Sequence, residues 1–174
     1  MDSLSHRIAR RLRGILAILL AAGALAAVPA HAATVAPSSK LVSANNIQSV
    51  IDYLESKGDK TERSKSDDGD PMLNESNNYY SVYFWCEDNH ASCDAIQFRA
   101  CYGDYADATP DKANAVSRDY FYAKSYIDKE GRACLELPVS TGLKGISYEA
   151  MDLSYEAFIG FTQSADDYFG EHSD

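Results

Sequence analysis

The stretch that decides the fold is Tyr79–Gly103, which reads YYSVYFWCEDNHASCDAIQFRACYG. Two runs within it, Tyr79–Trp85 and Ala95–Tyr102, are rich in the aromatic and β-branched residues that are typical of β-strands. A short polar loop separates the runs, and Cys86 and Cys93 stand on either side of this loop. The stretch therefore predicts an antiparallel hairpin with a cysteine at each end of its loop.

The N-terminus predicts export from the cytoplasm. Several arginines precede an apolar run, Ile15–Val28, and small residues at Ala30 and Ala32 follow it. This is the pattern of a secretory signal peptide, which we predict over residues 1–32. The apolar run is shorter than the roughly 20 residues that a membrane-spanning helix needs, so we expect no membrane span after cleavage. The predicted location is periplasmic or secreted.

The cysteines predict a disulfide framework. All four follow the predicted signal peptide, and an even number of cysteines in an exported chain is typical of disulfides. A bond between Cys86 and Cys93 would close the loop of the hairpin. Strand alternation points Cys101 and Cys134 away from the predicted core, which makes a bond between them consistent with the first.

The first of these bonds also predicts which face of the hairpin is buried. If Cys86 and Cys93 lie directly opposite each other, Trp85 lies opposite Asp94, and opposed residues share a face of the sheet. The predicted core face then carries Tyr83, Trp85, Ile96 and Phe98. The other face carries Val82, Phe84, Gln97, Arg99 and the cysteines. A shift of one residue in the pairing would change this assignment, which therefore depends on the disulfide.

The remainder of the chain predicts helices on either side of this hairpin. A first helix is expected after Ser43, which is a good N-cap. Apolar residues at helical spacing run from Ile47 to Leu54, and Gly58 ends the pattern. Later segments predict, in order, a short helix over 111–119, a second hairpin over 120–139 and a long helix over 148–169.

Together these elements predict one α+β domain. It has an antiparallel sheet of about five strands, an N-terminal helix, a short middle helix and a long C-terminal helix. We expect residues 33–42 to form a linker and residues 43–171 to form the domain.

The order of these elements resembles that of the YbjN family, which is described as bacterial sensory transduction regulators. The resemblance rests on Cys93–Phe98, similar to the family's Cys-x-x-Leu-Gln-Phe, and on Gly142–Ser147, which reads GLKGIS. It implies a fold like that of type III secretion chaperones and a binding or regulatory role, with no catalytic residues and no cofactor. Within Asn114–Ser117 the chain departs from the family, since Val116 and Ser117 stand where tryptophan and asparagine are usual.

The function that we predict is a non-enzymatic periplasmic binding or regulatory module, stabilised by disulfides. Its partner would be a protein or a second copy of the chain. A net charge of −10 makes nucleic acid an unfavourable partner. The candidate partner surface combines three residues of the non-core sheet face with three on the outer side of the last helix. These are Val82, Phe84, Arg99, Leu153, Phe161 and Tyr168.

The alternative is a small secreted enzyme or metal-binding protein that uses Cys86, His90 and Cys93. Their spacing suits a metal ion, but a zinc site would need a fourth ligand and reduced thiols. Because export favours oxidised cysteines, a disulfide is the preferred interpretation of this loop.

The signal-peptide hypothesis predicts cleavage between Ala32 and Ala33. Intact-mass measurement of the exported protein should give a chain that begins at Ala33. The substitution Ala32→Arg, which removes the small residue before the cleavage site, should leave the precursor uncleaved. An exported wild-type protein that retained residues 1–32 would contradict the prediction.

Overall fold

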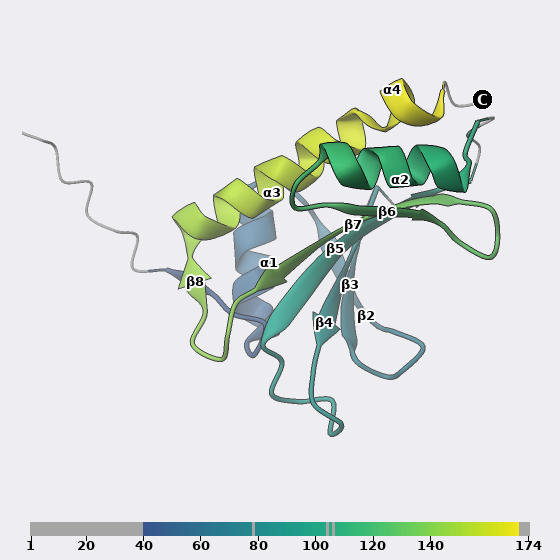
Figure 1. Cartoon of the computed structure of the whole chain (residues 1–174). Coiled ribbons are helices and arrows are strands. Elements are labelled where there is room, and N and C mark those ends of the chain that lie inside the picture. Colours follow the sequence, from purple (N-terminus) through teal and green to yellow (C-terminus); the bar gives the residue numbers. More distant parts are fainter. Residues whose placement is uncertain (1–39, 78, 104, 106, 171–174) are drawn as a thin grey trace, which may run out of the picture. The chain divides into compact units, whose positions relative to one another are not determined.

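The computed structural model describes residues 40–77, 79–103, 105 and 107–170, which belong to one compact unit. The predicted signal peptide and residues 33–39 of the predicted linker lie outside the described residues. The described part is α+β, as predicted, with helices and an antiparallel sheet (Figure 1).

Eight strands and four helices make up the described part of the chain. The strands are β1 (Leu41–Val42), β2 (Thr61–Lys65), β3 (Pro71–Glu75), β4 (Ser81–Trp85), β5 (Ala95–Tyr102), β6 (Lys124–Ile127), β7 (Ala133–Ser140) and β8 (Ile146–Ser147). The helices are α1 (Ile47–Ser56), α2 (Pro110–Asp119), α3 (Tyr148–Gln163) and α4 (Ala165–Phe169). None of the helices in the described residues is long and apolar enough to cross a membrane.

The main sheet has six strands in the order β2-β3-β4-β5-β7-β6, and every neighbouring pair is antiparallel. It has one strand more than the approximate number predicted, because Pro71–Glu75 forms a strand between β4 and the edge strand β2. The charged side chains of β2 suit an edge, where they discourage pairing with another chain. A second, two-stranded sheet joins β1 to β8.

The core lies on the face of the sheet that the helices cover. Val50 and Leu54 of α1 and Phe158 of α3 pack with Phe98 of β5, and each of these side chains is fully buried. The rings of Phe98 and Phe158 stack with their centroids 5.2 Å apart. Burial of each such side chain contributes about 1.5–3 kcal/mol to stability.

A second core cluster lies where α2 and α4 pack near β7. Val116 of α2, Leu135 of β7 and Phe169 of α4 are buried in it. Thr109 caps α2 by accepting a hydrogen bond from the amide of Lys112.

The predicted register of the central hairpin is wrong by one residue. Trp85 pairs with Ala95 rather than with Asp94, so Asp94 is an extra residue between Cys93 and the first pair of the ladder. The amide of Asp94 donates to the carbonyl of Trp85, at 3.2 Å. The carbonyl of Asp94 accepts hydrogen bonds from the amides of Thr141 and Gly142, at 2.9 and 2.8 Å. These bonds to a distant turn account for the inserted residue.

The shifted register exchanges the predicted faces of β4 alone, while Ile96 and Phe98 of β5 are buried as predicted. Val82 and Phe84 are 0% and 3% exposed and belong to the core, so their assignment to a partner surface is wrong. Trp85, predicted to lie in the core, is 58% exposed on the opposite face. A strand side chain changes face with each residue, so a single extra residue is sufficient for this exchange.

The start of the first helix and the continuity of the last helix also differ from the prediction. Ser43 is not the N-cap of α1, which begins at Ile47 after Asn46, because Leu41–Val42 pairs with β8 and the chain must turn before the helix starts. The last helix is interrupted at Ser164, which separates α3 from α4.

Both predicted disulfides are confirmed. Cys86 is bonded to Cys93, and Cys101 is bonded to Cys134, its direct partner in the β5–β7 ladder. The described residues contain no other cysteine.

The two bonds should differ in their contribution to stability. The Cys101–Cys134 bond closes a sequence separation of 33 residues and the Cys86–Cys93 bond one of only 7. In the chain-entropy account a longer loop loses more freedom when it is closed. Replacing Cys101 and Cys134 together by serine should lower the free energy of unfolding by about 2–4 kcal/mol. The matched Cys86→Ser and Cys93→Ser pair should cost about 1 kcal/mol less, and chemical denaturation would measure both. An equal or reversed order would contradict the prediction.

Candidate functional site

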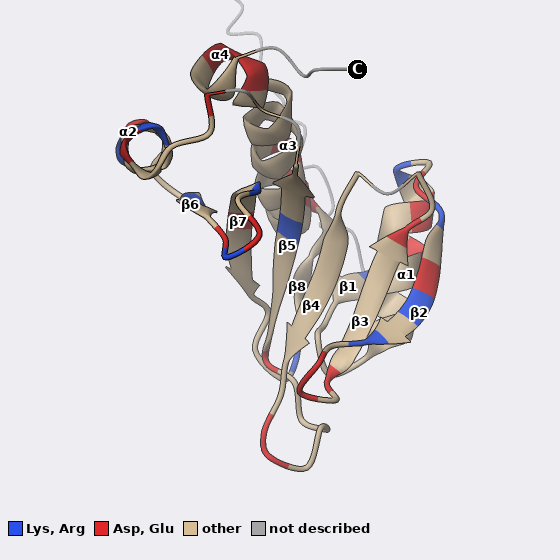
Figure 2. Cartoon of the chain, turned by 90° about the vertical axis from the view of Figure 1, so that its right-hand side faces the viewer, with Lys and Arg blue, Asp and Glu red and all other residues tan. Residues whose placement is uncertain are grey.

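The face of the sheet opposite the core has no helix over it in the described part of the chain. In Figure 2, α1 and α3 lie behind the strands, and this face is turned to the viewer. We call it the open face and define it by the outward residues of β3 to β6. They are Met72, Tyr83, Trp85, Gln97, Arg99, Glu136, Lys124 and Tyr126.

A pocket of about 400 Å³ lies on the open face. Outward side chains of five strands line it, including Met72, Tyr83, Gln97 and Lys124. The acidic β2–β3 turn, Asp67–Asp70, forms one of its borders. The pocket is therefore a shallow depression across the strands, with mixed polar and aromatic walls.

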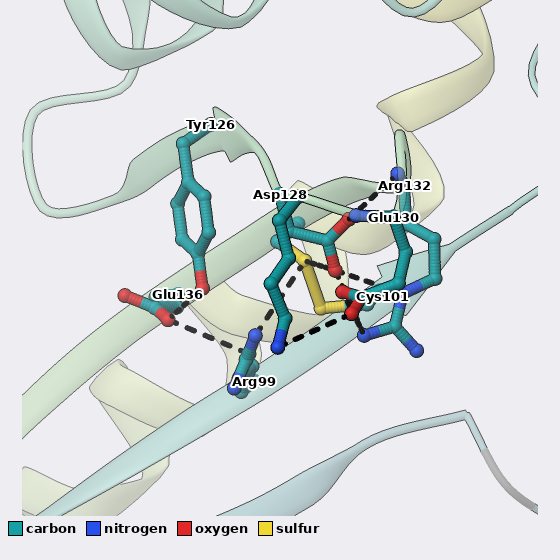
Figure 3. Close-up of polar contacts among 9 residues, drawn as sticks. Arg99, Cys101, Tyr126, Asp128, Glu130, Arg132 and Glu136 are labelled. Atoms are coloured by element: carbon teal, nitrogen blue, oxygen red, sulfur yellow. Dashed lines mark hydrogen bonds and ion pairs between the residues drawn. A yellow bond between two sulfur atoms is a disulfide. The ribbon is translucent and has the colours of Figure 1, made fainter.

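Glu136 is the buried charge of the open face. Its side chain is 7% exposed. The hydroxyl of Tyr126 donates to Oε1 at 2.6 Å, and Lys124 Nζ lies 3.0 Å from Oε2. Arg99 Nε lies 3.5 Å from Oε1 (Figure 3). A carboxylate with this burial is stable only when its charge is paired, and here two cations and a neutral donor surround it.

Arg99 is held between two aromatic rings. Its guanidinium carbon lies 5.6 Å from the ring centroid of Tyr83 and 5.9 Å from that of Tyr126. Both distances suit a cation–π interaction. Arg99 is thus fixed by an ion pair and two rings while 27% of its side chain remains exposed.

Tyr126 acts as a neutral hydrogen-bond donor at ordinary pH. Burial is the main cause that raises the pKa of Tyr126 to about 12, and the hydrogen bond and negative charge of Glu136 add to it. The hydroxyl proton therefore stays in place to stabilise the Glu136 carboxylate.

The β6–β7 turn adds a second charged pair beside the open face (Figure 3). Asp128 accepts hydrogen bonds from Arg132, whose guanidinium lies 2.8 Å from Oδ2. Burial alone would raise the pKa of Asp128, but the hydrogen bonds from the Arg132 backbone and guanidinium outweigh it and lower this pKa. The turn is thereby held in one conformation next to the Cys101–Cys134 bond.

Asp128 also lies near the sulfurs of this bond. Its Oδ2 is 3.7 Å from Cys134 Sγ, and Asp128, Cys101 and Cys134 form the one group of the described residues with spacing that suits a metal ion. In the disulfide the two sulfurs are bonded to each other and are not thiolates. Because a metal needs the thiolate form, the oxidised protein presents no such site here.

The predicted alternative site over Cys86, His90 and Cys93 is not assembled in the described structure. The two sulfurs form a disulfide, and His90 Nδ1 lies 2.7 Å from Asp70 Oδ1. His90 thus ties the β4–β5 loop to the β2–β3 turn at the border of the pocket. His90 has a positive φ of 56°, a conformation that is uncommon outside glycine.

The predicted partner surface on the last helix is only partly exposed. Leu153 is 72% exposed, but Phe161 is 2% exposed, so its assignment to the surface is wrong. Phe161 is buried because the segment after α2 packs against it, with the Tyr120 ring centroid 4.8 Å away. Tyr168 is half-buried and also packs against Tyr120.

Sequence reasoning placed Arg99 correctly on the non-core face but missed its neighbours. Trp85 and Tyr83 were assigned to the core by the one-residue error in register. On β7, Glu136 alternates with Leu135 and Leu137, which is a signal for its outward direction. On β6, the residue between Lys124 and Tyr126 is the polar Ser125, so no such signal marks their direction.

Comparison with known proteins assigns no family to the chain. No family model matches it, and no curated protein is detectably similar. The roles of the open-face residues are therefore argued from their geometry.

The substitution Glu136→Gln tests the charge network of the open face. It removes the negative charge that Arg99 and Lys124 share, so the free energy of unfolding should fall by about 1–3 kcal/mol. Chemical denaturation monitored by circular dichroism would measure the change. The control is Glu130→Gln, on the exposed turn, which should change stability by less than about 0.5 kcal/mol. Equal effects of the two substitutions would show that the network contributes nothing.

Proposed function

We propose that this chain is an exported, non-enzymatic binding module whose open face receives a segment of a protein partner. The observation that carries the proposal is Trp85. It is a large aromatic side chain, 58% exposed, at the wall of a pocket on a sheet face that no described helix covers. Tryptophan and arginine are the residues that most often dominate binding energy at protein interfaces.

The surroundings of Trp85 indicate the chemistry of the partner. Asp67 and Asp68 are exposed at the border of the same pocket, while Met72 lies beside them on its floor. A partner segment that places a bulky apolar side chain on Trp85 and a lysine or arginine near the two aspartates would match both features. The net charge of −10 also favours approach of a basic partner.

The fixed geometry of Arg99 suits binding. Its ion pair with Glu136 and its two ring contacts hold the guanidinium before a partner arrives. A side chain that is already ordered loses little freedom on association, so more of the contact energy remains available for affinity. The oxygens of Glu136 are engaged by Tyr126, Lys124 and Arg99, which favours a positioning role for this carboxylate over an acid–base role.

Two further observations support the wider proposal. The pair of disulfides is consistent with an oxidising compartment, and this supports a periplasmic or secreted location after removal of residues 1–32. The order of helix, four antiparallel strands, short helix, hairpin and long helix is the feature on which we base a proposed relationship to the YbjN family and its chaperone-like fold.

Binding to an array of synthetic peptides would test the proposal. We expect the oxidised protein to prefer peptides in which an aromatic or aliphatic residue neighbours a lysine or arginine. Trp85→Ala should weaken this binding about tenfold or more, as at interface hot spots. Since Trp85 is the only tryptophan of the chain, its fluorescence emission should shift to shorter wavelength when a peptide covers it.

The matched control is Leu153→Ala, which removes a still more exposed apolar side chain on α3. It should leave peptide binding unchanged. If Trp85→Ala binds as tightly as wild type, or if Leu153→Ala loses binding instead, the open face is not the binding surface.

A further inference from the structure

A second cavity, separate from the open face, lies between α3, the β3–β4 turn and the end of β5. Its volume is about 470 Å³, within the range of sites for small molecules. Three carboxylates line it, from Asp59, Glu75 and Asp166. No lysine, arginine or histidine is among the described residues of its wall.

Asp59 is a partly buried anion that only neutral groups contact. The hydroxyls of Tyr80 and Tyr155 both donate to its Oδ2, at 2.5 and 2.7 Å. Its Oδ1 takes part in none of the hydrogen bonds, and Asp59 in none of the ion pairs, among the described residues. Burial, followed by the hydrogen bond to Asp59, raises the pKa of Tyr80 and of Tyr155, so both hydroxyls stay neutral.

Glu75 supplies a second negative charge of the same kind. It is 3% exposed, and the backbone and side-chain amides of Asn77 donate to its two oxygens at 2.8 and 3.0 Å. These donors are neutral, and within the described chain Glu75 has no ion-pair partner. Asp59 and Glu75 thus place two negative charges at the cavity wall, and among the described residues no cation forms an ion pair with either of them.

Tyrosine side chains form much of the remaining wall. Tyr79 is 65% exposed, and Tyr80 is buried. Tyr102 and Tyr105 lie edge to face with ring centroids 5.8 Å apart. Aromatic rings attract organic cations through their negative faces, and cages of such rings are a common way to bind ammonium groups.

We propose that this cavity binds a small organic cation through its ammonium group. The tyrosine side chains of the wall would contact the ammonium, and the charges of Asp59 and Glu75 would balance it. A bare metal ion fits less well, because these carboxylates are not among the described groups whose oxygens lie close enough together to share one ion. The ammonium could belong to a quaternary amine or to a primary amine, and the two are separated by the choice of probe.

Isothermal titration calorimetry of the oxidised protein at low salt would test the proposal. Choline is the quaternary probe and 3,3-dimethylbutan-1-ol its neutral carbon analogue. Putrescine is the primary-amine probe and 1,4-butanediol its neutral counterpart. At least one cation should bind about tenfold or more tightly than its neutral counterpart. If neither cation binds, or if the neutral compounds bind equally well, the proposal is wrong.

Two substitutions locate the binding. Asp59→Asn should weaken it about tenfold by removing one charge. Gln163→Lys, at the exposed end of α3 on the cavity wall, places a competing cation there and should abolish it. The control Asn114→Lys adds the same charge on the exposed side of α2 and should bind as wild type. Because Gln163 is exposed, its replacement keeps the test valid even if Asp59→Asn disturbs the fold.

The outcome is independent of the proposed function of the open face. Trp85→Ala should leave cation binding unchanged. Binding that survives both Gln163→Lys and Asp59→Asn in folded protein would place the cation elsewhere and overturn the assignment.

Discussion

The arrangement of both faces of the sheet depends on one inserted residue, Asp94. Its amide bonds to the carbonyl of Trp85, and its own carbonyl accepts the amides of Thr141 and Gly142. These bonds join the central hairpin to the turn that follows β7 and keep Asp94 out of the ladder. The pleat of β4 and β5 is thereby fixed, with Val82 and Phe84 inward and Trp85 outward. The packing of the core and the composition of the open face both follow from these side-chain directions.

Much of the fold could be predicted from the sequence, because the spacing of apolar residues and the face of the strand on which each cysteine lies can be read from neighbouring residues. Strand-forming runs around Cys86 and Cys93 predicted the hairpin, and alternation on β5 and β7 predicted the Cys101–Cys134 bond. The register could not be predicted in the same way. It depends on contacts between Asp94 and Thr141, which are far apart in sequence, and no local pattern reports such contacts. Phe161 was misplaced for a related reason, since the segment that buries it belongs to a separate part of the chain.

The candidate sites were still less accessible to sequence reasoning, because they depend on tyrosine–carboxylate pairs. Tyr53 donates to Asp152, Tyr105 to Asp166 and Tyr126 to Glu136. The chain has more Asp and Glu than Lys and Arg, so neutral tyrosine hydroxyls supply many of the hydrogen bonds that partly buried carboxylates need. The burial and hydrogen bonds raise the pKa of all three tyrosines, so the donors persist well above neutral pH. Glu136 and Asp152 pair with cations of the protein as well. Asp59 instead accepts hydrogen bonds from the neutral hydroxyls of Tyr80 and Tyr155, so its negative charge is available to a cationic ligand.

The edges of the main sheet also limit how a partner can bind. The outer strand on one side, β2, carries Glu62, Arg63 and Lys65, and Figure 2 shows both signs of charge along it. The strand on the other side, β6, has only four residues and lies beside α2. Neither edge favours the addition of a further strand, which would extend the backbone hydrogen bonds of the sheet. A partner that crosses the strands instead would be selected by the shape and charge of its side chains, and a helical or a looped segment would serve as well as an extended one.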